Sequence, residues 1–267
     1  MLDQQTIETA AAALHKAEQD CQPMGQLGLA HPQMTIEDGY AIQQHWTAIK
    51  LAEGRRIVGR KIGLTSRAMQ QMFGLTEPDY GTLFDDMVFA EGSDIPVDRF
   101  IVPMVEVELA FYLGKPLQGE NVTLTEVLNA TEFVSPAVEL IDARTHRIDP
   151  ETGNGRQVTD TIADNAACAG IITGGRPVRP MDVDLRWVGA MLSRNGVVEE
   201  TGLAAGVLNH PANGIVWLAR RFAAHGIALE PGQVILCGSF TRPIAVNKGD
   251  TFHLDYGDLG SMGFRFV

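Results

Sequence analysis

The segment 101–113 constrains the fold of this chain more than any other, because it is apolar along most of its length and yet carries Glu106 and Glu108. Successive side chains of a β-strand point to opposite faces, so these two glutamates would share one face. On a surface strand they would form an ordinary solvated face. In a buried strand two unpaired carboxylates are costly, and a cation is their natural partner. The apolar flanks favour the buried alternative.

A second apolar segment carries one more acid. In residues 134–141, VSPAVELI, the only charged side chain is that of Glu139. Carboxylates from Glu106, Glu108 and Glu139 would suit a hard cation, Mg²⁺ or Mn²⁺, rather than zinc, which prefers nitrogen and sulfur ligands. The alternative, that the three glutamates are only surface charge, stays open at this point, because 33 acidic residues outnumber 21 basic ones.

Composition excludes several other classes of protein. A net charge of −12 would repel a nucleic-acid backbone, so we expect no nucleic-acid partner. No apolar run approaches the ~18 residues of a membrane span, and the first residues lack the basic and apolar regions of a secretory signal. Three cysteines without CxxC spacing suggest neither a disulfide framework nor a zinc site. We therefore expect a cytoplasmic protein without a membrane partner.

Hydrophobic periodicity and capping patterns predict helices over 6–20, 35–54 and 211–225 and a strand over 57–64. A short helix is expected after this strand, carrying Met69, Met72 and Phe73. Further strands are expected over 101–113, 133–141, 184–194, 197–200, 233–237 and 251–266.

The sequence predicts two turns among these strands. Asn195-Gly196 predicts a hairpin with a type I′ turn, because both central residues of that turn need a positive φ. The segment 247–250 is expected to turn the chain again. The pattern indicates an α+β fold in which a helical N-terminal segment packs on a larger mixed β-barrel or rolled sheet. We expect a single catalytic domain over 1–267, mainly helical in 1–90 and β-rich in 91–267, where the metal would bind.

The three glutamates, in this order and context, resemble the metal triad of the fumarylacetoacetate hydrolase superfamily. Three C-terminal segments of this chain resemble the last strands of that superfamily: GSFT at 238–241, VNKGDT at 246–251 and GDLGSM at 257–262. The segments GRKIGLTS at 59–66 and DTIADNA at 160–166 are similar to the hydratase and decarboxylase branch of aromatic meta-cleavage pathways. The resemblance spans nearly the whole chain, and it implies the rolled sheet of that family's C-terminal domain and a homo-oligomer.

One departure concerns a lysine. Hydrolases of the superfamily carry a lysine shortly before the Asp-Thr that corresponds to Asp160-Thr161, and this chain has RQVT at 156–159. The resemblance implies that Lys61 takes its place, binding the substrate carboxylate or acting as acid and base. From the residues alone, we would expect Lys61 to be exposed on an edge strand. Asp79 could orient Lys61 or help to activate water, but the sequence PDYG at 78–81 is equally typical of a turn.

The resemblance implies a metal-dependent lyase, a hydratase acting on a small 2-oxo or 2-hydroxydienoic acid in aromatic catabolism. The nearest likeness is to homoprotocatechuate degradation, which implies conversion of 2-oxohept-4-ene-1,7-dioate to 4-hydroxy-2-oxoheptanedioate. Thr161 and Thr241 are candidate hydrogen-bond donors to the substrate. A seven-carbon diacid also needs a cation at its distal carboxylate, and three arginines are candidates that the sequence does not separate: Arg144, Arg156 and Arg242.

Alternative functions share these motifs. They are decarboxylation of a 2-oxo-3-enedioate, hydration of the shorter 2-hydroxypenta-2,4-dienoate, and a non-catalytic metal-binding barrel subunit of a pathway complex. The first two would use the same residues, so the motifs do not separate them.

Overall fold

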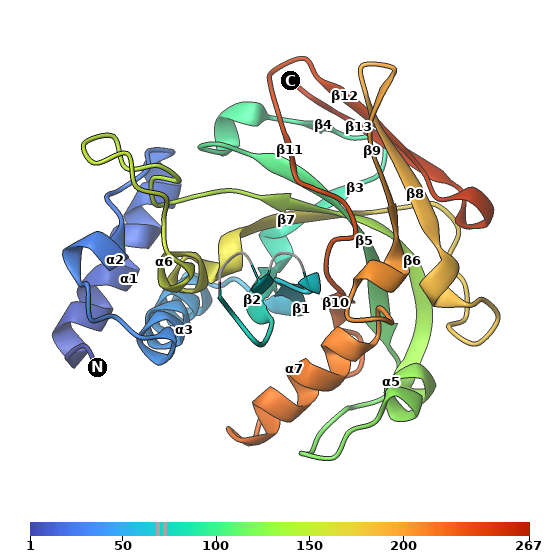
Figure 1. Cartoon of the computed structure of the whole chain (residues 1–267), viewed down its shortest axis with the longest axis horizontal. Helices are drawn as coiled ribbons and strands as arrows, with labels where there is room; N and C mark the ends of the chain where they lie inside the picture. Colours follow the sequence, from blue (N-terminus) through green and yellow to red (C-terminus); the bar gives the residue numbers. More distant parts are fainter. Residues whose placement is uncertain (68–69, 72–73) are drawn as a thin grey trace.

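The computed structural model describes residues 1–67, 70–71 and 74–267. A layer of helices lies on the left of Figure 1, and two curled sheets lie on the right. The helices expected over 6–20 and 35–54 are present, whereas Met69, Met72 and Phe73 of the expected short helix lie outside the described residues. The layer consists of α1 (Gln4–Asp20), α2 (Leu27–Ala30), α3 (Ile36–Ala52) and α6 (Val158–Ala163).

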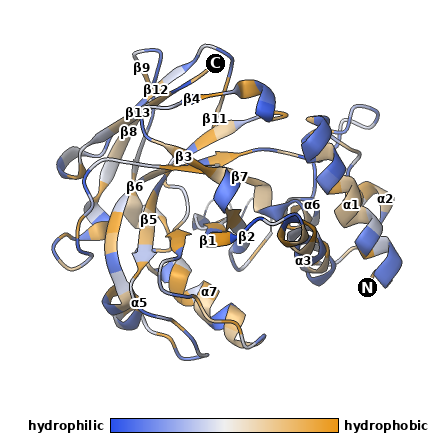
Figure 2. Cartoon of the chain, turned by 180° about the vertical axis from the view of Figure 1, so that it is seen from behind, coloured by the Kyte–Doolittle hydropathy of each residue, from blue (hydrophilic) through white to orange (hydrophobic). Residues whose placement is uncertain are grey.

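Side-chain caps explain where the two long helices begin. Asp3 accepts a hydrogen bond from the Thr6 backbone at the start of α1. Thr35 and Asp38 form the predicted capping box at the start of α3, each side chain bonding the other residue's backbone. Figure 2 shows hydrophilic and hydrophobic residues alternating along α1, as expected for a helix with one buried face.

The larger sheet has eight strands in the order β2-β1-β10-β5-β6-β7-β3, with β11 pairing with β5 off this path. Strand β1 runs parallel to β10, although the two lie far apart in the sequence, and β5 and β6 are antiparallel neighbours. The strands are β1 (Ile57–Gly63), β2 (Asp79–Phe84), β3 (Val88–Ala90), β5 (Met104–Leu113), β6 (Thr131–Ile141), β7 (Cys168–Thr173), β10 (Val234–Leu236) and β11 (Ile244–Ala245).

The second sheet has five strands in the order β4-β13-β12-β8-β9. The β8–β9 turn has φ of 54° at Asn195 and 82° at Gly196, so the predicted I′ hairpin is confirmed. The strands are β4 (Asp94–Ile95), β8 (Gly189–Arg194), β9 (Val197–Leu203), β12 (Thr251–Asp255) and β13 (Ser261–Phe266). Helices α5 (Leu124–Ala130) and α7 (Asn213–Ala223) lie together at the lower edge of Figure 1.

The largest errors in the extent of the predicted strands concern two segments. The expected strand 251–266 is a hairpin, because Gly257 and Gly260 adopt positive φ in the turn between β12 and β13. The expected strand 184–194 begins only at Gly189, because a 3-10 turn precedes it, capped by the Asp184 side chain. The division of the chain at residue 90 stays a prediction. Three strands of the large sheet, β1, β2 and β3, come from the part of the chain before this division.

The two faces of β5 pack against different cores. Its odd-numbered residues, among them Val107, join a core with β6, α7 and the second sheet. Ala110, on the even face, joins a second core with α1, α3, β2 and β7, which includes Leu14 and Trp46. The alternation predicted for β5 is therefore present, and Glu106 and Glu108 project from the face shared with Ala110.

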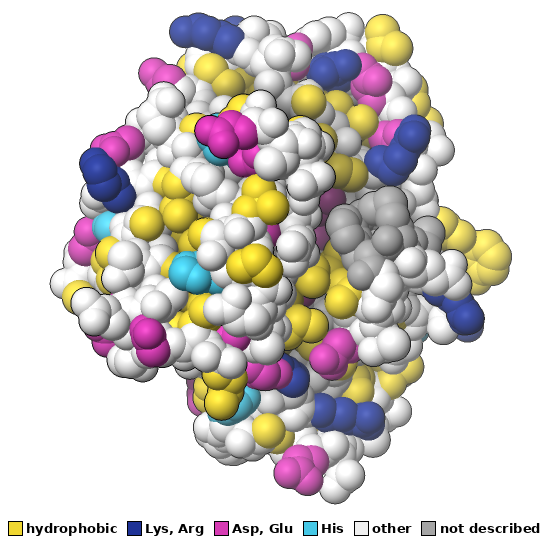
Figure 3. Space-filling model, turned by 60° about the vertical axis from the view of Figure 1, so that its left-hand side comes forward, with side chains coloured by type: hydrophobic (Ala, Val, Ile, Leu, Met, Phe, Trp, Pro, Cys, Tyr) yellow, Lys and Arg dark blue, Asp and Glu magenta, His cyan; other side chains and the backbone are white. Residues whose placement is uncertain are grey.

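Within the described residues, no helix combines the length and apolarity needed to cross a membrane. Acidic and basic side chains are dispersed over the face shown in Figure 3, with no continuous basic patch.

Candidate active site

The three glutamates meet at the centre of the large sheet. Glu106 lies directly opposite Glu139 in the β5–β6 register, and Glu108 follows two residues along on the same face of β5. One carboxylate oxygen from each of the three lies within 4.8 Å of the others. Glu108 and Glu139 are fully buried, so the alternative of plain surface charge does not describe them.

The environment of these carboxylates fits a hard cation. Gly238 donates its backbone N–H to Glu108 Oε2 at 2.8 Å, but Glu108 Oε1 and Glu139 Oε2 accept no hydrogen bond from the described residues. Burial, followed by the charge of Glu139, raises the pKa of Glu106 to about 7, and the same causes raise the pKa of Glu108. Buried, crowded and partly unsatisfied carboxylates of this kind are a donor set for Mg²⁺, Mn²⁺ or Ca²⁺.

Lys61 of β1 lies beside this cluster. Its Nζ is 3.2 Å from Glu139 Oε1, and the residue is buried because β1 lies between β2 and β10. The alternative of an exposed edge lysine is therefore excluded. Burial disfavours the charged form of Lys61, but the carboxylates of Glu139 and Asp79 outweigh it and raise the pKa of the lysine. Lys61 is thus a buried ammonium group.

Asp79 is the first residue of β2 and is buried, so it lies in a strand rather than in the alternative turn. An added Cβ at Gly63 would lie 2.3 Å from Asp79 Oδ1 and 3.0 Å from Lys61 Nζ, so both groups border one small space that only glycine leaves free. Burial raises the pKa of Asp79 despite the charge of Lys61. Asp79 Oδ1 accepts no hydrogen bond from the described residues.

Two cavities open beside the cluster and share Gly63, Leu64, Glu106 and Pro243 as lining residues. The first, about 220 Å³, is also lined by Lys61, Asp79, Arg147, Arg156 and Thr161. The second, about 470 Å³, is also lined by Ser66, Glu200, Thr241 and Arg242. All seven residues that the sequence singled out as ligands, catalytic groups or substrate contacts are thereby brought to one region.

The three candidate arginines have different environments. Arg144 is buried and ion-paired with Asp164, so it is a structural residue outside both cavities. Arg242 is exposed and ion-paired with Glu200. Arg156 lines the smaller cavity, with its Nη1 3.2 Å from Asp164 Oδ2.

Sequence reasoning missed three features of this region. Arg147 lines the smaller cavity but lies in a loop whose sequence has no periodicity to place it. Gly238, with φ of 115°, donates its backbone N–H to Glu108, and no sequence pattern predicts this contact. Ala166 and Ala167 line the smaller cavity, and both have left-handed backbone conformations that alanine rarely adopts.

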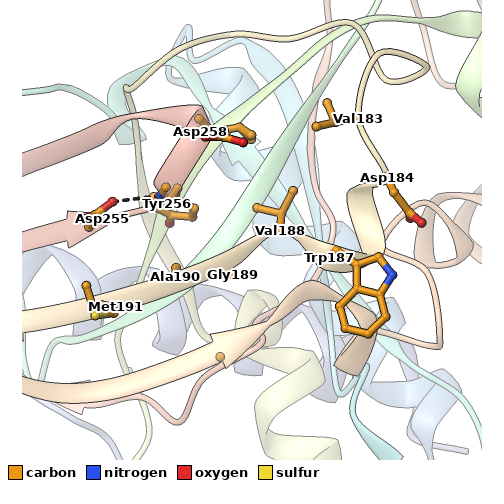
Figure 4. A pocket seen from close by; sticks show the side chains of 13 residues that line it. Val183, Asp184, Trp187, Val188, Gly189, Ala190, Met191, Asp255, Tyr256 and Asp258 are labelled. Atoms are coloured by element: carbon orange, nitrogen blue, oxygen red, sulfur yellow. Dashed lines mark hydrogen bonds between the residues drawn. The ribbon is translucent and has the colours of Figure 1, made fainter.

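A separate pocket of about 650 Å³ lies on the second sheet, and none of the three glutamates lines it. Figure 4 shows Trp187 and Asp184 at one end of it and Met191 and Asp255 at the other. Its described lining contains no lysine, arginine or histidine, so it gathers no acid–base pair.

A family model described as fumarylacetoacetate (FAA) hydrolase C-terminal matches residues 37–267. The chain belongs to this family. The fold and the resemblance expected from the sequence are thereby confirmed.

Two relatives of this chain are hydratases. It is 59% identical over 267 residues to 2-oxo-hept-4-ene-1,7-dioate hydratase of Escherichia coli, covering 100% of both chains. It is 40% identical over 262 residues to 2-keto-4-pentenoate hydratase of Paraburkholderia xenovorans strain LB400, covering 98% of this chain and 95% of that one. These relatives are hydro-lyases by name.

A solved structure is similar over the whole molecule. 4-Oxalocrotonate decarboxylase from Pseudomonas putida G7, complexed with magnesium and adipate, has a TM-score of 0.94 and 33% identity, covering 100% of this chain and 99% of that one. The chain therefore belongs to the hydratase and decarboxylase branch of the family.

Proposed function

We propose that this chain is a divalent-metal-dependent hydratase that converts 2-oxohept-4-ene-1,7-dioate, through its 2-hydroxydiene tautomer, to 4-hydroxy-2-oxoheptanedioate. The observation that carries the proposal is the 59% identity over both full lengths to the Escherichia coli enzyme named for this substrate. A cytoplasmic location, a homo-oligomeric state and a place in homoprotocatechuate breakdown stay predictions.

Glu106, Glu108 and Glu139 would hold the metal, with Mg²⁺ or Mn²⁺ as the expected ion. When bound, a divalent cation supplies Lewis acidity that draws electron density from the oxygen atoms of a 2-oxo acid. The structures of the decarboxylase relative in complex with magnesium and with calcium support a hard cation.

Lys61 and Asp79 are the proposed proton-handling pair. The Lys61 ammonium, beside Glu139, would donate a hydrogen bond to the substrate oxygen on which negative charge develops. Asp79 Oδ1, buried and without a hydrogen-bond partner in the described chain, would accept a proton from the water that adds to C4. The 2-hydroxydiene tautomer loses the proton of its C2 hydroxyl and gains one at C5, which gives a 2-oxo-3-ene. Addition of water then places the hydroxyl at C4 and a proton at C3. Thr161 and Thr241 would donate hydrogen bonds to the substrate from the two cavities.

The test is an assay of the purified chain with Mg²⁺ and 2-hydroxydienoates of five and seven carbons. We expect loss of the diene absorbance and a product heavier than the substrate by one water. Absence of turnover with every substrate would overturn the proposal and favour the non-catalytic subunit.

Decarboxylation is the second candidate, because the similar solved structure is a decarboxylase. Release of carbon dioxide from a 2-oxo-3-enedioate, without addition of water, would identify this reaction. The two activities are distinguished by mass spectrometry of the products.

A further inference from the structure

The loop between β6 and α6 doubles back on itself. Ile148 and Gly155 form an isolated β-bridge, and Arg156 donates its backbone N–H to the Arg147 carbonyl at 2.9 Å. The two arginines therefore face each other across the base of this loop. Gln26 fixes the loop to the helical layer, because its side chain donates hydrogen bonds to two loop carbonyls.

Both arginines line the cavity that contains Lys61 and Glu106, so they reach the same space as the metal-binding cluster from a different element. The same cavity has an apolar wall, formed by Ile141, Val158, Ala166 and Ala167. A wall of this kind suits a short carbon chain between two polar ends.

Basic side chains outnumber acidic ones in the described lining of this cavity, with Lys61, Arg147 and Arg156 against Asp79 and Glu106. Asp164 is the acid beside Arg156, but it also forms the buried ion pair with Arg144. Arg147 has no ion pair in the described part of the chain, and its only side-chain hydrogen bond there is a 3.4 Å contact from Nη2 to the Val102 carbonyl. The Nε of Arg147 is buried and has no hydrogen-bond partner among the described residues. Burial and the like charge of Arg156 lower the pKa of Arg147 to about 10. Buried donors without partners are rare in folded proteins, and this one belongs to a residue that lines the cavity.

We propose that Arg147 and Arg156 bind the distal carboxylate of a dicarboxylic substrate and make the chain selective for diacids over monoacids in the same reaction. This inference rests on the proposed function. A guanidinium binds a carboxylate through two parallel hydrogen bonds, and an anion here would satisfy the Arg147 Nε and relieve the repulsion between the two arginines. Arg144 lines neither cavity and Arg242 lines only the larger one, so Arg147 and Arg156 are the guanidinium groups of the smaller cavity in the described chain.

The test compares Arg147→Gln and Arg156→Gln with the wild type on two substrates, the seven-carbon 2-hydroxydienedioate and the five-carbon 2-hydroxypenta-2,4-dienoate. We expect kcat/KM for the diacid to fall by about 10- to 100-fold, mainly through KM, because a charge-assisted hydrogen bond is lost. For the monoacid, kcat/KM should change by less than about threefold. Arg147→Lys should lose part of the diacid preference, because lysine keeps the charge but not the paired donors.

The control is Arg186→Gln, which removes an equal charge from an exposed ion pair that lines neither cavity. It should leave the ratio of the two kcat/KM values unchanged. Equal losses on both substrates in the Arg147 and Arg156 variants would mean that they contact the shared C1 end or only support the fold, and would overturn the inference. No loss on either substrate would overturn it as well.

A binding measurement separates this inference from the proposed reaction. Calorimetry in Mg²⁺ would compare 2-oxoheptanedioate with 2-oxopentanoate, neither of which has a double bond to hydrate. The wild type should prefer the diacid, and Arg147→Gln should lose that preference, even if no substrate is turned over. A wild type that binds both equally would contradict the inference, whereas turnover alone decides the proposed function.

Discussion

Glu106 of β5 lies directly opposite Glu139 of β6 in an antiparallel register. Directly opposed side chains in such a ladder are the nearest neighbours between strands, and like charges in that position are destabilising. Lys61 neutralises part of this charge through its 3.2 Å contact with Glu139. These opposed carboxylates therefore lower the stability of the fold when no cation is bound.

Glu108→Gln should abolish metal binding without unfolding the protein. The side-chain oxygen of glutamine can still accept the Gly238 N–H, while one of the buried like charges is removed. Turnover should fall roughly 100-fold or more, because Lewis-acid assistance is worth several kcal/mol. In EDTA the variant should be at least as stable as the wild type.

Thermal melts with and without Mg²⁺ measure this effect. At Mg²⁺ a hundredfold above its dissociation constant, the wild type should gain about 2.7 kcal/mol, and the variant should gain nothing. Equal stabilisation of both proteins by Mg²⁺ would show that the ion binds elsewhere.

Gly238→Ala should weaken metal binding as well as stability. Gly238 has φ of 115°, and an added Cβ would lie 2.2 Å from Thr65 Oγ1, so the backbone that donates to Glu108 has to move. Loss of a partner that orients a metal ligand typically lowers metal affinity about 10- to 100-fold. Calorimetric titration with Mg²⁺ measures this affinity.

Gly249→Ala is the matched control, because Gly249 also has a positive φ, of 90°, but an added Cβ there meets no atom within 4 Å. It should cost about 1 kcal/mol of stability and leave the affinity for Mg²⁺ unchanged. If the two variants weaken Mg²⁺ binding alike, the contact between Gly238 and Glu108 does not position the ligand.

Arg144→Met should destabilise the fold by about 3 kcal/mol, because it leaves the buried carboxylate of Asp164 without its main partner. Denaturant unfolding measures the loss. The exposed pair of Arg186 with Asp184 provides a comparison, and Arg186→Met should change the midpoint very little. Similar midpoints for the two variants would contradict the structural role of Arg144.

Ala166→Gly should stabilise the chain by roughly 1 kcal/mol, although most alanine-to-glycine changes do the opposite. Ala166 has φ of 50° and ψ of 37°, a left-handed conformation that glycine adopts without a steric penalty. Ala11→Gly, in the middle of α1, is the control and should cost about 1 kcal/mol. Urea unfolding of both variants should therefore give shifts of opposite sign, and a loss at both positions would refute the argument.

Asp38 should make the fold sensitive to acid. Burial opposes its ionisation, but hydrogen bonds from Thr35 and from the Leu2 backbone outweigh burial and lower the pKa of Asp38. A lowered pKa in the folded state adds stability above the unfolded value of ~3.9, and this stability is lost as the pH falls through the folded value.

The stability lost in Asp38→Asn, relative to the wild type, should therefore be largest near neutral pH and shrink below about pH 4. Chemical unfolding at several pH values measures this difference. Asp182→Asn is the control, because it removes a carboxylate from an exposed position. A difference for Asp38→Asn that stays constant down to pH 2 would contradict the role of the charge.

The local features of this protein follow from short segments of its sequence. The alternation along β5 placed Glu106 and Glu108 on one face, the capping box at Thr35 began α3, and Asn195-Gly196 formed its hairpin. Each of these depends on residues within a few positions of one another, so periodicity and backbone preference are sufficient to predict them. The lone charge in the apolar segment 134–141 added Glu139 as a candidate ligand, and the family resemblance added Lys61.

The contacts between distant residues depend on the folded sheet. Parallel pairing of β1 with β10 buries Lys61, the β5–β6 register brings Glu139 to Glu106, and the loop after β6 directs Arg147 into the cavity. No local pattern encodes these contacts, because they join segments that are distant in sequence and depend on how the sheet curls and packs. A register shift of one residue would turn the Glu139 side chain to the opposite face, so the site exists only in the completed sheet.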